Sequence, residues 1–61
     1  MSASMLLARL ADLLLDPAVP DAEVTEGLAA RVGVRQARRL LAVAHGIAAD
    51  RLWAAAEGGA A

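Results

Sequence analysis

The side chains of this sequence that could act as nucleophiles or bases are few and far apart. Ser2, Ser4 and Thr25 are the hydroxyl side chains, and His45 is the single histidine. We expect Ser2 and Ser4 at a frayed chain end and Thr25 near a helix start. His45 falls in the last turn of a predicted helix, where a positive charge is mildly favoured. We therefore predict no catalytic residues and no enzyme.

Metal and cofactor chemistry also lacks its usual residues. Asp12 and Asp16 have the helical spacing of a carboxylate pair, but they share a narrow polar face with Arg9, which is typical of solvated acids. The chain has no cysteine, and its glycines stand singly or in the C-terminal tail rather than in a phosphate-binding loop. We predict no metal site and no cofactor.

One group of residues has the chemistry of nucleic-acid or acidic-partner contacts: Arg35, Gln36, Arg38 and Arg39. The net charge of −1 and the pI of about 5.6 argue against a strongly basic nucleic-acid binder. The charge is segregated, with a net of −4 over residues 1–30 and +3 over residues 31–61. The basic group is either a solvated face balanced by acids of the same molecule, or one half of a complementary contact between molecules.

Length and composition indicate one small all-α domain. A chain of 61 residues is one domain at most, and chains this short are marginally stable alone. Hydrophobic residues make up 59% of the chain, many of them alanine, which favours helix. Phe and Tyr are absent and β-branched residues are few, so a sheet is not expected. We predict a single helical domain over residues 1–57 and a flexible tail over residues 58–61.

Targeting and source can also be predicted from composition. The apolar N-terminal run has no basic segment before it and is interrupted by Arg9 and Asp12, so it is a poor signal peptide. No stretch approaches the roughly 18 apolar residues of a membrane span. The acidic polar face of the first helix also argues against a membrane-surface helix. We expect a cytoplasmic protein and, since all basic residues are Arg, a bacterial genome of high GC content.

Helix breakers divide the chain into three or four short helices. We predict a first helix over about residues 4–15, a second that Asp21 caps and Gly33 closes, and two more over about residues 34–45 and 48–57. DPAVP, Gly33 and Gly46 separate these helices. The alternative is one long bent helix through Gly46, because a helical glycine costs only about 1 kcal/mol relative to alanine. The residues expected to face inward are Val24, Leu28, Val32, Ala37, Leu40, Leu41, Ala44, Leu52 and Ala55.

The stretches LAARVGVRQAR and LAVAHGIAADR share Leu-Ala, a glycine, a β-branched residue and an arginine. The second resembles the helix-turn-helix family, in particular small repressor-like all-helical domains. This resemblance implies helix-turn-helix-like packing around Gly46, with Ala42 allowing close approach of two helices, and a similar turn at Gly33. The helix after Gly46 is mostly alanine and a poor reader of bases. The helix after Gly33 has the right side chains but carries Arg39 where the family has an apolar residue.

The first helix carries more leucine than a small bundle can cover. Six leucines, at positions 6, 7, 10 and 13–15, spread over roughly 220° of the helix, against the ~100° of an ordinary surface helix. Large exposed apolar patches usually mark interaction sites. We therefore predict a protein–protein interaction module that self-associates, docks a larger partner, or both. The predicted interface residues are Leu6, Leu7, Leu10, Leu13, Leu14 and Trp53.

The alternative function is a dimeric helix-turn-helix regulator that binds DNA through Arg35, Gln36, Arg38 and Arg39. In that case binding should weaken steeply with salt, whereas assembly through leucines should survive it.

Overall fold

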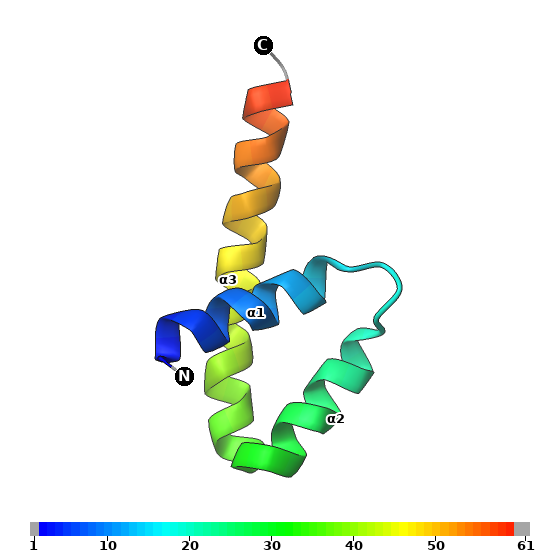
Figure 1. The fold of residues 1–61 in the computed structure, drawn as a ribbon, viewed down its shortest axis with the longest axis vertical. Coiled ribbons are helices and arrows are strands. Elements are labelled where there is room, and N and C mark those ends of the chain that lie inside the picture. The colour runs from blue at the N-terminus through cyan, green and yellow to red at the C-terminus, as the bar shows by residue number, and fades with distance from the viewer. Residues whose placement is uncertain (1, 60–61) are drawn as a thin grey trace.

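The computed structural model describes residues 2–59, and every regular element in this range is an α-helix (Figure 1). Helix α1 spans Ala3–Leu15, α2 spans Asp21–Val32 and α3 spans Val34–Gly59. The prediction of a small all-α bundle is confirmed.

Local hydrogen bonds explain where α1 ends and α2 begins. Ser2 caps α1, since its Oγ accepts a hydrogen bond from the Met5 N–H at 3.2 Å. After α1 the Asp16 carboxylate accepts the Ala18 N–H at 2.9 Å, which forms a turn over the first proline of DPAVP. The expected N-cap Asp21 is wrong by one residue. Pro20 is the N-cap, and its carbonyl accepts the N–H groups of the first turn.

Gly33 alone joins α2 to α3. Its φ of 88° and ψ of 158° lie in a region that residues with a side chain rarely adopt. Its N–H donates to the Ala29 carbonyl at 2.9 Å, and its own carbonyl accepts the Ala37 N–H at 2.9 Å. This one residue therefore ends one helix and begins the next, and the chain reverses there.

Gly46 does not form the expected second turn. Helix α3 is continuous from Val34 to Gly59, and among the described residues only Gly33 has a positive φ. The separate helix over residues 48–57 and the turn at Gly46 are therefore wrong, and the alternative of one long helix is confirmed. The helix also includes Gly58 and Gly59 of the expected tail, while Ala60 and Ala61 lie outside the described residues.

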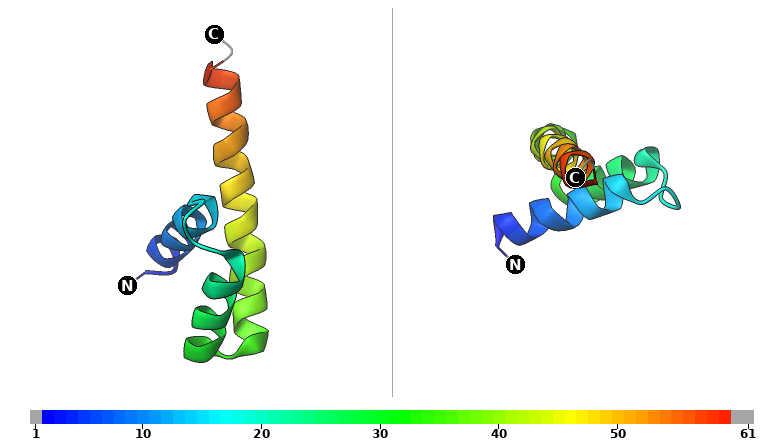
Figure 2. Two further views of the ribbon diagram at one scale, coloured as in Figure 1. Left: turned by 90° about the vertical axis from the view of Figure 1, so that its right-hand side faces the viewer. Right: turned by 90° about the horizontal axis from the view of Figure 1, so that it is seen from above.

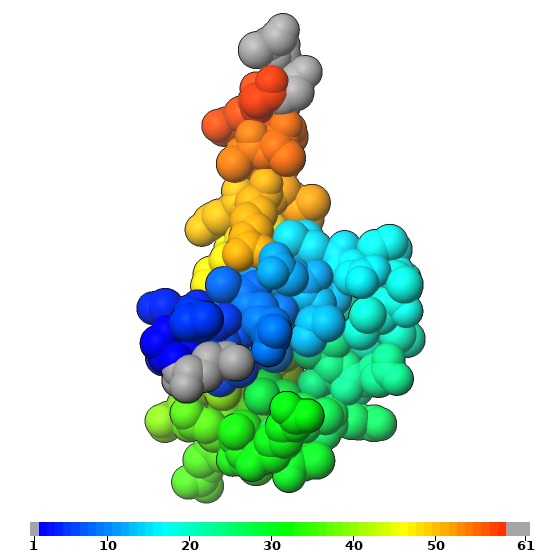
Figure 3. All heavy atoms as spheres, viewed as in Figure 1, coloured from blue at the N-terminus to red at the C-terminus, as the bar shows by residue number. Residues whose placement is uncertain are grey.

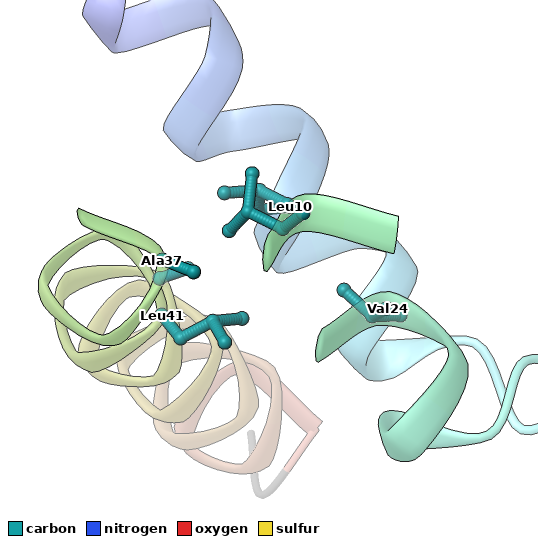
Figure 4. Close-up of a cluster of buried hydrophobic side chains, with 6 residues drawn as sticks. Leu10, Val24, Ala37 and Leu41 are labelled. Atoms are coloured by element: carbon teal, nitrogen blue, oxygen red, sulfur yellow. The ribbon is translucent and has the colours of Figure 1, made fainter. Parts of the chain in front are cut away.

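The core joins all three helices (Figure 4). Its buried residues are Leu10 of α1, Val24 and Leu28 of α2, and Ala37, Leu41 and Ala44 of α3. The inward positions predicted for α2 and α3 are thus largely confirmed, with Leu40 half-buried beside them.

Three residues expected to face inward do not. Val32 is 41% exposed because it is the last residue before the reversal, and Leu52 is 60% exposed. Ala55 is exposed as well. Leu52 and Ala55 belong to the C-terminal half of α3. The C-terminal end of this helix projects beyond α1 and α2 (Figure 3), and no element of residues 2–59 covers it.

Helix α1 crosses α3 where the side chains are small. Ala11 and Ala44 have no exposed surface and Ala48 is 6% exposed, so the two backbones approach closely. Next to them an ion pair joins Asp12 of α1 to Arg51 of α3. Helices α1 and α2 lie on one side of α3, and no described part of the chain covers its opposite side (Figure 2). This free side and the projecting end of α3 are the main surfaces that the fold leaves uncovered.

Candidate interaction surfaces

A groove of about 360 Å³ lies between α1 and α2, the two helices that face the viewer in Figure 3. Its apolar lining comes from both helices and from the loop between them: Leu6, Leu10, Leu13, Val19, Val24, Leu28 and Val32. Three charged residues, Arg9, Glu23 and Arg31, complete the lining. An apolar groove with a few charges is the type of surface that binds an amphipathic helix.

Gly27 lines this groove without contributing a side chain to it. It lies in the interior of α2, and a Cβ built on it would meet no other atom within 4 Å. A side chain at this position would therefore project into open space and occupy the groove. Sequence reasoning did not single out Gly27, although an isolated glycine within a helical pattern is a signal of a packing or functional reason.

The predicted leucine interface is divided between the core and this groove. Leu10 is 5% exposed and belongs to the core, although it also borders the groove. Leu6 and Leu14 pack against the core and are half-buried, as is Leu7. Leu13 is 37% exposed and lines the groove. The uncovered leucine surface is therefore smaller than the sequence alone indicates, because α3 covers part of α1.

Trp53, the sixth predicted interface residue, lies far along α3 and is 68% exposed. Together with Ala49, Leu52 and Ala56 it lines a shallow apolar hollow on the projecting part of the helix. An aromatic side chain of this size buries roughly 150–250 Å² when it packs, so an exposed Trp53 leaves a sizeable apolar surface in water. The structure thus separates Trp53 from the leucines of α1 and assigns it to a different surface.

The four predicted polar contact residues are brought together at the start of α3. All four are exposed. Arg31, in the last turn of α2, is exposed at the same end of the molecule. Within residues 2–59 the only ion pair is the one between Arg51 and Asp12, so none of these arginines is paired with a carboxylate there. They form an exposed basic end of the molecule.

Two of the three hydroxyl groups considered as nucleophiles, those of Ser2 and Thr25, make local backbone contacts. The Ser2 Oγ caps α1, and the Thr25 Oγ1 donates to the Asp21 carbonyl at 3.0 Å. His45 is exposed on α3. In the part of the chain that the structure describes, no three His, Cys, Asp or Glu side chains lie close enough together to hold a metal ion. Nor is any helix of residues 2–59 both long and apolar enough to cross a membrane.

Comparison with protein-family models, with curated proteins and with solved structures found no match to this chain. Its function is therefore inferred from its own surfaces.

Proposed function

We propose that this chain is a small helical protein–protein interaction module that binds a helix of a larger partner protein in the groove between α1 and α2. The observation that carries the proposal is the groove itself, whose lining is apolar on both walls and open to solvent. Leu13 and Val32 are the exposed apolar residues of its two walls. Covering them would remove apolar surface from water, at about 25 cal/mol per Å².

The charges of the groove define the partner further. Two arginines, Arg9 and Arg31, and one acid, Glu23, border the apolar lining. The partner helix therefore needs apolar residues at i, i+3, i+4 and i+7, flanked by more acidic than basic side chains. The charges orient the helix, while the apolar contacts supply most of the affinity.

The test is a selection of helical peptides displayed on phage, with the wild-type chain as bait. We expect amphipathic peptides with an acidic flank to be enriched. Gly27→Leu, which fills the groove, should weaken the selected peptides by about tenfold or more, a loss of at least about 1.4 kcal/mol. The matched control is Gly46→Leu, the same substitution at another helical glycine with open space around it, which should leave binding unchanged. Absence of any binder, or binders indifferent to Gly27→Leu, would contradict the proposal.

A second candidate function is DNA binding through the basic end of the molecule. The observation that favours it is the exposure of Arg35, Arg38 and Arg39 directly after the reversal at Gly33. Under this proposal duplex DNA binds with an affinity that falls steeply with salt, and the double variant Arg38→Ala with Arg39→Ala loses that binding. Fluorescence anisotropy of labelled duplex DNA measures both effects. Binding that is equal in the double variant would exclude this function.

A further inference from the structure

A continuous face of α3 lies opposite the core and is not covered by any described part of the chain (Figure 2). At 100° per residue, the buried Ala37, Leu41 and Ala44 define the inward direction of the helix. The residues of the opposite arc, about 120° wide, are all exposed. We call this arc the outer face of α3.

The charges on the outer face are separated along the helix. Arg35 and Arg39 lie at its N-terminal end, with Arg38 exposed beside the face, and Asp50 and Glu57 lie at its C-terminal end. The remaining charge of the C-terminal part, Arg51, points to α1 and pairs with Asp12, so it does not neutralise these acids. The basic and acidic ends are more than 15 Å apart at about 1.5 Å per residue, beyond the Debye length of about 8 Å at physiological salt. The two ends therefore cannot satisfy each other within one molecule.

The middle of the outer face has small residues along one side and Val43, which is 51% exposed, along the other. Ala42, Gly46 and Ala49 follow one another along the first side, and a Cβ built on Gly46 would meet no atom within 4 Å. Small residues at this spacing allow a second helix to approach closely. The apolar Trp53 continues the face toward the acidic end.

We propose that the outer face of α3 binds the same face of a second copy of this chain, with the two α3 helices antiparallel and the two-fold axis beside Gly46. In this register Arg35 lies near Glu57 of the second copy, and Ala42 lies near Ala49 of the second copy. Arg39 lies near Trp53 of the second copy, where an arginine over the indole ring adds a cation–π contact. A parallel pair would instead place arginines against arginines and acids against acids, so the charges select the antiparallel arrangement.

The length of α3 also favours a second copy of this chain as the binding partner of the outer face. A standard interface buries roughly 800 Å² on each partner, more than a short stripe around Trp53 can supply. A 26-residue helix is about 39 Å long. The antiparallel pair uses most of this length, because the basic end of each copy contacts the acidic end of the other. Both ends and the small-residue middle are thereby covered at once.

The first experiment uses two matched glycine variants. Gly46→Arg places a long charged side chain at the two-fold axis, where the two copies would clash and repel. Arginine is a better helix former than glycine, so the monomer keeps its fold. Gly27→Arg is the control, since it makes the same change in another helix with open space around it. We expect light scattering to give twice the 6.2 kDa chain mass for the wild type and for Gly27→Arg, and the mass of a single chain for Gly46→Arg at the same concentration.

The second experiment tests orientation, and the absence of cysteine in the chain makes it direct. Ala42→Cys and Ala49→Cys are prepared separately and oxidised alone and mixed. An antiparallel pair gives disulfide-linked dimers in the mixture and few in either variant alone. Linkage of each variant to itself would show a parallel pair and overturn the proposal.

The remaining outcomes are equally decisive. A monomeric wild type over the whole concentration range, or a dimer that survives Gly46→Arg, would overturn the pairing of α3. A dimer lost in Gly27→Arg instead would assign self-association to the α1–α2 groove. The inference goes beyond the proposed function and uses a different surface, so peptide binding in the groove and dimer formation through α3 can fail separately.

Discussion

Replacing Gly33 or Gly27 with alanine should change the free energy of unfolding in opposite directions. Gly33 has a φ of 88°, where any side chain is strained, whereas Gly27 lies in a helix with open space around it. We expect Gly33→Ala to lower the free energy of unfolding by about 1–3 kcal/mol. Gly27→Ala should raise it by up to about 1 kcal/mol.

Urea unfolding followed by circular dichroism measures both changes, at one protein concentration for all three chains. Equal effects of the two substitutions would mean that the reversal at Gly33 tolerates a side chain. In that case the positive φ would not be the reason that glycine is needed at position 33.

Gly33 and Gly46 have the same local sequence pattern. In each case Leu-Ala begins five residues earlier and a β-branched residue comes directly after the glycine. The outcome differs because of what each turn would bury. Reversal at Gly33 brings Val24 and Leu28 into the core, worth about 1.5–3 kcal/mol for each side chain. A reversal at Gly46 would bury no comparable apolar side chains. Continuing the helix through this glycine costs only about 1 kcal/mol. Local pattern alone cannot distinguish the two cases, because the deciding contacts are distant in sequence.

At the scale of the elements, α1 is held to α3 by apolar packing more than by its ion pair. Leu10 is buried in the core, while the Arg51 and Asp12 side chains are 39% and 69% exposed. We expect Leu10→Ala to cost about 2–5 kcal/mol, enough to unfold a domain of this size. Asp12→Asn, two residues away, should cost at most about 1 kcal/mol.

Thermal unfolding followed at 222 nm compares the two variants in low and high salt. The small loss in Asp12→Asn should disappear in high salt, because salt screens an exposed pair. A loss in Asp12→Asn as large as that in Leu10→Ala would show that the ion pair is the main link between the helices.

The packing of the helices also explains which part of the candidate groove could be predicted from the sequence. The surplus of leucine on α1 correctly predicts that part of this helix stays exposed, as Leu13 does. It does not predict that Leu10 is in the core, or that α2 supplies Gly27, Arg31 and the second wall of the groove. Those assignments depend on how α1 crosses α3, which rests on the small residues Ala11 and Ala44. Alanine is so frequent in this chain that its position carries little signal.

The whole molecule is more extended than its length requires. Its extents are 42 × 24 × 18 Å, and its radius of gyration is 12.5 Å. A compact domain of 61 residues has a radius of gyration of roughly 10.5 Å. The excess comes from the projecting end of α3, whose Leu52 and Trp53 are exposed (Figure 3). In a monomer this end has few contacts to keep it helical beyond its own hydrogen bonds.

Hydrogen exchange therefore reports the state of the whole molecule. In dilute solution we expect the amides after Arg51 to exchange fast, since local opening costs little where few side chains are buried. If α3 pairs with a second copy, raising the concentration should slow exchange from Ala42 to Glu57 by about tenfold or more, because opening there must first separate the copies. Exchange in α1 should change little, because its contacts are the same in both states.

The variant Gly46→Arg separates pairing from simple helix stability in this measurement. Its α3 is a better helix, yet its C-terminal exchange should stay fast at every concentration, since the axis of the pair is blocked. Slow exchange after Arg51 even in dilute wild type would mean that the projecting end is stable without a partner. Its exposed Trp53 would then not be evidence of a missing second helix. The groove between α1 and α2 would remain as the proposed binding surface of this chain.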